Sequence, residues 1–177
     1  IINMINILKT TATLNEKLLF TTKEQELICG KLLGLEPAFR QLIVVDKAGN
    51  EHFTLSRLSL ITSQQLFEQI IKPILSNTNS NTIDISSIYI DKISYEPMLC
   101  ISVPITDLFG DMTGILVAEV NLKFMWDFIG NMQIGKKGVA YIIDNNGYLI
   151  AYKDITRVLE GKNLTHIKII NDFIINT

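Results

Sequence analysis

The chain has 177 residues, of which 47% are hydrophobic and 19% are charged, and its formal net charge is −2 at pH 7. This length suits one good core or two small ones, and the composition excludes a disordered chain. The absence of any long run of Lys or Arg argues against a nucleic-acid partner, because such a partner selects a basic surface stripe. No window holds about 18 consecutive apolar residues, so no transmembrane helix is predicted within the chain.

The first segment, residues 1–36, is predicted to be helical, because leucines recur at roughly helical spacing and no Gly or Pro precedes Gly30. Pro37 disfavours helical geometry at the residue before it and ends the element. Two capping boxes would each restart the helix near Lys23, namely Thr22 with Gln25 or Thr21 with Glu24. The segment is therefore predicted to be one long or broken amphipathic helix.

The middle of the chain predicts an antiparallel sheet. An apolar run over residues 42–45, a turn at Asp46–Gly49 and an alternating stretch over residues 53–57 are typical of a β-hairpin. A short helix is predicted over 64–76 and a polar loop over 76–81. Three strands are predicted over 87–90, 98–105 and 114–122, with a hairpin turn over 107–111 between the last two. A helix over 123–132 follows the third strand. No βαβ crossover is visible, which excludes a parallel doubly wound fold. The predicted class is α+β, with a PAS-like five-stranded antiparallel sheet and flanking helices behind the long N-terminal helix.

A quasi-repeat indicates a second unit. The stretches LIVVDKAGNEHFTL and YIIDNNGYLIAY share two apolar residues, an Asp-x-x-Gly turn and an alternating strand, so Asp46 and Gly49 correspond to Asp144 and Gly147. Turns of this kind also occur in unrelated hairpins, which leaves coincidence as an alternative. After the second copy a turn over 156–162 and a helix over 164–175 are predicted. The expected division is residues 1–36, 37–133 and 134–177, the last being the incomplete start of a second PAS-like unit in a piece of a longer protein.

Cysteine and histidine do not point to a reactive site. Cys29 and Cys100 lie among apolar neighbours and are predicted to be buried thiols, although a disulfide between them is left open. His52 and His166 lie far apart without further ligands nearby, so no metal site is predicted. No catalytic constellation and no bound cofactor are expected, and the segment is predicted not to be an enzyme.

Three stretches together carry a family resemblance. They are GILVAEVNLK ahead of Trp126 and Asp127, GKKGVAYIIDNNGYLIAYKD from Gly135, and VLEGKNL from Val158, with LLGLEPAFRQLIVVDKAGNEHFTLSRL upstream. The chain resembles the double Cache (dCache, or PDC) sensor domains of bacterial and archaeal receptors over roughly residues 25–170. The likeness is strongest to those on sensor histidine kinases and membrane-bound nucleotide cyclases.

The resemblance implies an extracytoplasmic small-molecule-sensing domain that flanking spans outside this chain anchor in the cell membrane. A membrane-distal unit would bind the ligand, a membrane-proximal unit would follow, and the N-terminal helix would pair with its copy in a homodimer. The output domain of the full-length receptor is expected to be a histidine kinase, with an adenylate or diguanylate cyclase or a chemoreceptor as alternatives.

Glu119 and Arg57 are the first candidates for ligand contact. Side chains of a strand alternate, so Glu119 shares a face with Ile115 and Val117, where an unpaired carboxylate is costly. Amino-acid-binding Cache domains place an acid at this strand position to receive the ligand's amine, but this chain lacks their Arg-x-Trp-Tyr element. Glu119 is predicted either to contact a ligand or to pair with Arg57.

Tyr89, Tyr95 and Asp107 complete the candidate ligand-binding set. Both tyrosines flank a loop where such pockets open, and each offers an apolar ring with a hydroxyl tip, although ordinary packing is the alternative. Asp107 ends a strand and either contacts a ligand or caps a turn. Trp126 is predicted to pack the helix that follows the last strand between the two units.

Two alternatives to a ligand sensor stay open at this stage. An intracellular PAS-like domain with haem or flavin is disfavoured, because neither histidine lies on a predicted pocket helix. A ligandless dimerisation module would use the N-terminal helix alone.

Overall fold

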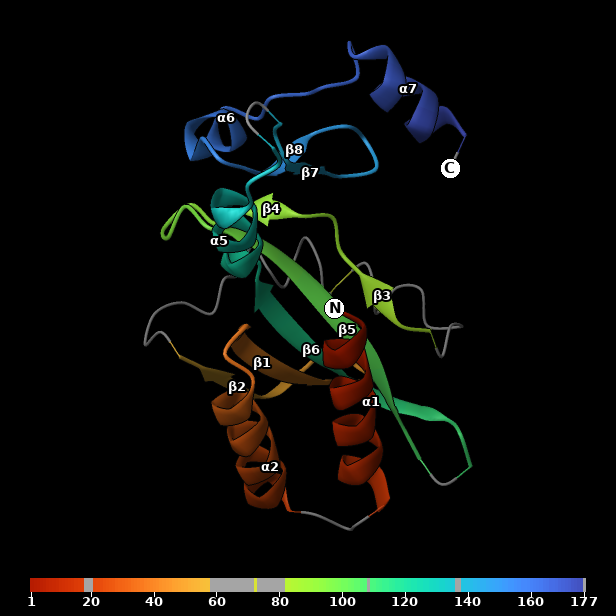
Figure 1. Ribbon diagram of the computed structural model, residues 1–177. Coiled ribbons are helices and arrows are strands. Elements are labelled where there is room, and N and C mark those ends of the chain that lie inside the picture. The colour runs from red at the N-terminus through yellow and green to blue at the C-terminus, as the bar shows by residue number, and fades with distance from the viewer. Residues whose placement is uncertain (18–20, 58–71, 73–81, 108, 136–137, 177) are drawn as a thin grey trace. The chain divides into compact units, whose positions relative to one another are not determined.

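The computed structural model describes residues 1–17, 21–57, 72, 82–107, 109–135 and 138–176 (Figure 1). The chain divides into two compact units, unit 1 (Ile1–Ser87 and Leu99–Val120) and unit 2 (Ile88–Met98 and Asn121–Thr177). The helix after Asn121 belongs to unit 2. The predicted division into residues 1–36, 37–133 and 134–177 stays a prediction. The helix predicted over 64–76 and the loop predicted over 76–81 lie outside the described residues.

Two helices, α1 (Ile2–Lys17) and α2 (Thr22–Leu35), lie side by side at the start of unit 1 (Figure 1). The break falls at one of the two predicted capping boxes, because the Thr21 N–H and hydroxyl donate to the Glu24 carboxylate at 2.8 and 2.9 Å. Glu36, the residue before Pro37, is extended, with φ −107°. Proline therefore ends α2 where the sequence predicts.

The confirmed class is α+β with an antiparallel sheet. The strands are β1 (Phe39–Asp46), β2 (Glu51–Ser56), β3 (Asp84–Ile85), β4 (Tyr89–Ile90), β5 (Pro97–Thr106) and β6 (Met112–Asn121). Their order is β2-β1-β6-β5-β3, and β4 pairs with the first residues of β5. Within the described residues the sheet has six strands, one more than predicted, because Asp84 and Ile85 add a short strand opposite Ser102 and Ile101.

Strand β1 forms the centre of the core of unit 1. Its residues Gln41–Val45 are all buried, so both faces of the strand are covered. Leu42 lies opposite Leu55 on β2 and Ala118 on β6, and these side chains share one face. A Cβ on Gly30 of α2 would lie 3.9 Å from Leu55, which places α2 against that face.

The core of unit 1 draws residues from both helices and four strands. Cys29 and Cys100 are buried in it, as predicted. Its buried apolar side chains also include Met4, Leu8, Ala12, Leu32, Phe39, Leu42, Val44, Phe53, Ile101, Val103, Leu116 and Val117.

The two Asp-x-x-Gly segments form the same turn. Gly49 and Gly147 have φ of 89° and 82°, and each donates its N–H to the Asp carbonyl three residues earlier at 3.0 Å. Asp46 accepts the N–H of Asn50, and Asp144 accepts that of Tyr148, each at 2.8 Å. Hydrogen bonds from the side chain and backbone of Asn50 also lower the pKa of Asp46. The quasi-repeat therefore extends to the hydrogen bonds of the two turns.

Unit 2 is built on the second of these hairpins. It contains α5 (Lys123–Asn131), β7 (Tyr141–Ile143), β8 (Leu149–Tyr152), α6 (Ile155–Leu159) and α7 (Lys168–Ile175). Its core consists of Trp126 and Ile129 from α5, Leu149 and Ala151 from β8, and Val158 from α6. The Trp126 indole N–H donates to the Ile150 carbonyl at 2.7 Å, which fixes α5 on β8.

Two elements of unit 2 differ from the prediction. The turn predicted over 156–162 begins as α6, because Asp154 accepts the Thr156 N–H and caps a helical turn. The helix predicted from Leu164 begins only at Lys168, because Leu164 donates its N–H to Gly147 and lies beside β8. Among the described residues, no helix is long and apolar enough to cross a membrane.

Candidate functional site

Glu119 on β6 carries a buried carboxylate that is fully engaged. Its side chain is 2% exposed, and its two oxygens accept hydrogen bonds from Nε and Nη2 of Arg40 at 2.7 and 2.9 Å. Such a two-bond pair satisfies a carboxylate that would otherwise be costly to bury. The predicted pairing of Glu119 with Arg57 is therefore wrong.

The sheet register explains why Arg40 reaches this carboxylate. Glu119 lies opposite Gln41, and the register of β1 against β6 shifts between Phe39 and Gln41. Arg40 lies in that irregularity, where the strict alternation of side chains does not hold. Arg40 can therefore approach the same face as Gln41.

Arg57 donates hydrogen bonds to carbonyls at the C-terminal end of helix α2. Its Nε donates to the carbonyl of Phe39 at 2.8 Å, and its Nη2 donates to the carbonyls of Leu33 and Glu36. The last carbonyls of a helix have no partner within the helix, and a cation is favourable there. The contacts of Arg57 are thus those of a helix cap.

The other three predicted site residues are Asp107, Tyr89 and Tyr95. Asp107 accepts the N–H groups of Phe109 and Asp111, both at 2.9 Å, which is the turn-capping alternative. Tyr89 lies on β4 and is partly buried. Tyr95 is 63% exposed and has φ 55°, an uncommon backbone conformation for an aromatic residue.

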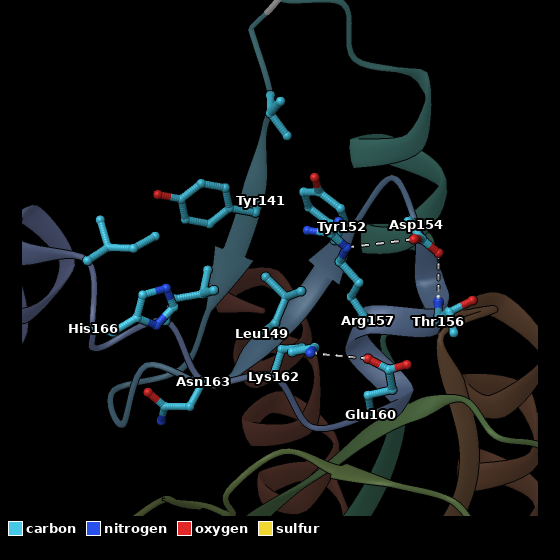
Figure 2. A pocket seen from close by; sticks show the side chains of 13 residues that line it. Tyr141, Leu149, Tyr152, Asp154, Thr156, Arg157, Glu160, Lys162, Asn163 and His166 are labelled. Atoms are coloured by element: carbon cyan, nitrogen blue, oxygen red, sulfur yellow. Dashed lines mark hydrogen bonds and ion pairs between the residues drawn. The ribbon is translucent and has the colours of Figure 1, made fainter.

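Unit 2 contains a hollow of about 690 Å³ (Figure 2). Its floor and walls come from the β7–β8 hairpin, α6 and the segment that follows α6. The lining residues are Val139, Tyr141, Leu149, Tyr152, Asp154, Thr156, Arg157, Glu160, Lys162, Asn163, Leu164, His166 and Ile167. Ligand sites in proteins have volumes of about 300–1,000 Å³, and the volume of this hollow falls within that range.

The charges around the hollow form two loose pairs. Arg157 Nε lies 3.8 Å from Asp154 Oδ2, and Lys162 Nζ lies 3.6 Å from Glu160 Oε2. Both separations exceed hydrogen-bonding distance, and all four side chains are more than half exposed. The Arg157 guanidinium lies 5.5 Å from the centre of the Tyr152 ring (Figure 2).

Backbone contacts fix the wall that carries Lys162. The Leu149 N–H donates to the Lys162 carbonyl, and the Leu164 N–H donates to the Gly147 carbonyl, both at 2.9 Å. Between them, the Asn163 amide donates to the Asn146 carbonyl at 2.9 Å. The hollow is therefore formed by backbone that hydrogen bonds hold in place.

No sequence pattern predicts this hollow as a site. Glu160 and Lys162 belong to the VLEGKNL stretch, which contributed to the resemblance but had no assigned role. Arg157 and Tyr152 have no special spacing in the sequence. His166 was considered only as a metal ligand, and among the described residues no group of three His, Cys, Asp or Glu is placed to hold a metal ion.

Comparison with known proteins gives structural neighbours only. No protein-family model and no curated protein sequence matches the chain. Among solved structures, it is similar to the ligand-binding domain of the Pseudomonas aeruginosa amino-acid chemoreceptor PctC in complex with GABA, with TM-score 0.70 and 14% identity. It is also similar to the ligand-binding domain of the P. aeruginosa chemoreceptor PctB in complex with L-Arg, with TM-score 0.66 and 16% identity.

A third neighbour is the extracellular domain of mmHK1S-Z2, whose name assigns it provisionally to the histidine kinases, with TM-score 0.68 and 14% identity. These matches cover 93%, 93% and 97% of this chain. The chain spans 71%, 62% and 73% of the three neighbours, so part of each neighbour has no counterpart here. The fold is that of extracellular sensor domains of chemoreceptors and histidine kinases, as the resemblance implied.

Proposed function

We propose that the chain is a small-molecule-sensing domain of a transmembrane signalling receptor, with a histidine kinase as the first candidate for the output. The observation that carries this proposal is the fold, which matches ligand-binding and extracellular sensor domains over more than nine-tenths of the chain. The signal would be a population shift, in which the ligand binds one conformation more tightly than another. A cyclase or chemoreceptor output is the alternative.

The proposal places the domain on the extracytoplasmic side of the membrane, anchored by spans outside this chain. Support comes from the neighbours, which are extracellular domains or ligand-binding domains of receptors. In the full-length gene, alkaline phosphatase fused within the β5–β6 turn should be active only if this domain is exported. An inactive fusion with intact expression would refute the placement.

A homodimer through the N-terminal helix is part of the same proposal. Ile2 and Ile7 of α1 are 75% and 38% exposed, which leaves apolar surface for a partner helix. Sedimentation velocity of the chain should show a dimer that Ile7→Asp converts to a monomer. A wild-type monomer at millimolar concentration would refute dimerisation through α1.

The direct test of sensing is a ligand screen on the purified chain. Amino acids, GABA, other carboxylates, amines and nucleobases would be screened by thermal unfolding and then titrated by calorimetry. A ligand at a hundredfold excess over its dissociation constant stabilises the native state by about 2.7 kcal/mol, which is readily seen as a higher Tm. If no compound raises Tm, the sensing proposal fails and a ligandless dimerisation module replaces it.

The contacts in unit 1 bear on where a ligand would bind. Both oxygens of Glu119 accept from Arg40, so direct ligand contact there would require this pair to open. Arg57 and Asp107 are likewise engaged with backbone groups. Tyr89 and Tyr95 stay in the proposal as ligand contacts, and the screen should be repeated on Tyr89→Phe and Tyr95→Ala to test them.

A further inference from the structure

We propose that the hollow in unit 2 is a binding site for a small molecule that carries a carboxylate on an apolar body. The binding follows from the residues around the hollow. A role of this binding in signalling rests on the proposed function. None of the predicted site residues lines this hollow. It would therefore be a site separate from Glu119 and the residues around it.

The apolar body has walls to contact. Leu149 is nearly buried at the base of the hollow, and Leu164 is partly buried beside it. Val139 and Tyr141 are 54% and 41% exposed and border the same space. Burial of apolar surface of the ligand against these side chains provides a favourable contribution of about 25 cal/mol per Å².

The carboxylate has two cations to bind. Arg157 and Lys162 lie on the lining, and no hydrogen bond of either side chain is seen within the described residues. Their nearest carboxylates stand at 3.8 and 3.6 Å, so the donors of both are available to a ligand. Arginine presents a planar fork that matches a carboxylate with two parallel hydrogen bonds.

Several polar groups around the hollow have no hydrogen-bond partner among the described residues. Besides the two cations, the hydroxyls of Tyr141 and Tyr152 and the ring of His166 make no hydrogen bond to any described residue. Of the two lining carboxylates, Asp154 already accepts the Thr156 N–H at 3.2 Å. A ligand carboxylate could therefore accept hydrogen bonds from the two cations and from these hydroxyls.

The Arg157 side chain and the backbone of Lys162 are held in position. The Arg157 guanidinium lies over the Tyr152 ring, a contact that restricts its rotamers. Lys162 lies on the wall held by the Leu149 N–H, and its own N–H donates to the Arg157 carbonyl at 3.3 Å. In Figure 2 Arg157 and His166 lie on opposite sides of Leu149, and Lys162 is drawn below it. Restriction of the Arg157 side chain before binding lowers the entropy lost when a ligand binds.

The test compares 3-phenylpropanoate with its neutral amide, 3-phenylpropanamide, by calorimetry on the 177-residue chain. The two molecules share the apolar body and differ in charge. The carboxylate should bind about tenfold or more tightly than the amide, because a hydrogen-bonded ion pair is worth more than a neutral bond. Equal affinity of the two compounds, or no binding of either at about 10 mM, would overturn the proposal.

Three variants locate the binding. Arg157→Gln should weaken 3-phenylpropanoate about tenfold, and Lys162→Gln should weaken it less, because a lysine offers no two-pronged bond. Lys47→Gln is the matched control, since Lys47 is exposed in the β1–β2 turn and lies outside the hollow. It removes the same charge and should leave the affinity unchanged. Wild-type affinity in Arg157→Gln would overturn the proposal even if the compound binds.

The two proposals fail in different ways. If amino acids or other compounds raise Tm equally in wild type and in Arg157→Gln, the chain is a sensor whose ligand binds elsewhere, and the hollow proposal is wrong. If 3-phenylpropanoate binds at the hollow but no compound alters the output of the full-length receptor, the hollow stands as a binding site and the sensing proposal is wrong.

Discussion

The chain uses an arginine beside a carboxylate in two opposite ways. In unit 1, Arg40 and Glu119 are joined by hydrogen bonds of 2.7 and 2.9 Å, and the Glu119 side chain is 2% exposed. In unit 2, Arg157 and Asp154 stand 3.8 Å apart and both are more than half exposed. The first pair satisfies a charge that the sheet has buried, whereas the second leaves donors available to solvent or to a ligand. The difference indicates that Glu119, the charge that the sequence pattern singles out, has a structural role. The arginine that is available to a ligand is Arg157, which no sequence motif singles out.

The largest expected effect tests the structural role of the first pair. Glu119→Ala removes both hydrogen bonds that join Arg40 to this carboxylate and should lower the free energy of unfolding by about 3–5 kcal/mol, measured by urea denaturation. The matched control is the double variant Arg40→Met, Glu119→Leu, which removes both charges and should recover most of the loss. A loss below about 1 kcal/mol in Glu119→Ala would mean that the pair is not the structural element inferred here.

The same pair shows what the sequence could and could not predict. The hairpins were predictable because Asp-x-x-Gly segments carry local turn chemistry, and both turns have the expected bonds. The buried position of Glu119 followed from strand alternation, and its need for a partner followed from burial. Its partner was not predictable, because Arg40 reaches it through an irregularity of register that the alternating pattern does not reveal.

The hollow could not be predicted from the sequence, for a different reason. Its lining comes from β7, β8, α6 and the segment after α6, and only folding brings these together. Local patterns predict the elements but not the space that they enclose. The capped helical turn at Asp154 was also missed, although Asp is a favoured N-cap, because the polar stretch after it was interpreted as a turn.

A second prediction disrupts the hollow while keeping all its charges. Gly147 has φ 82°, and a Cβ there would lie 2.6 Å from Thr165 and 3.2 Å from Ile174. Gly147→Ala should therefore combine backbone strain with steric overlap and cost about 2–4 kcal/mol. It should also weaken ligand binding at the hollow, because the wall from Lys162 to Leu164 pairs with Gly147 and Leu149.

Gly110→Ala is the control for this substitution. Gly110 has φ 87°, but a Cβ there would meet no atom within 4 Å, so only the backbone strain applies. Its cost should be about 1 kcal/mol, measured by urea denaturation alongside Gly147→Ala. Equal costs at the two positions would show that the overlap at Gly147 relaxes freely.

The ion pair of Lys123 with Glu96 is short but exposed, so it tests whether bond length or burial determines how much an ion pair stabilises the fold. Lys123 Nζ lies 2.9 Å from Glu96 Oε1, as close as the pair in unit 1, yet the Lys123 side chain is 56% exposed. Its hydrogen bond to Glu96 raises the pKa of Lys123 above the ordinary 10.5. A raised pKa means that the stabilisation is fully present below about 10.5 and is lost as the pH rises through the folded value.

The measurement is the free energy of unfolding of wild type minus that of Lys123→Met, from about pH 8 to pH 12. The difference should be constant up to about pH 10 and should decline above it. Its size should be far below the effect of Glu119→Ala, because an exposed pair is screened by solvent. A difference as large as that of Glu119→Ala would show that bond length, not burial, sets the strength of these pairs.

The smallest expected effect concerns the pair of Arg157 with Asp154. It decides whether the Arg157 guanidinium is available to a ligand. A double-mutant cycle with Arg157→Gln and Asp154→Asn should give a coupling energy of about 0–0.5 kcal/mol, since both groups are exposed and not hydrogen-bonded to each other. Asn also caps helices, so Asp154→Asn retains the cap on α6 and isolates the charge. A coupling above about 1 kcal/mol would mean that Asp154 already holds Arg157, and a ligand carboxylate would then have to displace it. A coupling near zero leaves the guanidinium unengaged, and Asp154→Asn should then strengthen binding of 3-phenylpropanoate by removing a negative charge that repels the ligand carboxylate.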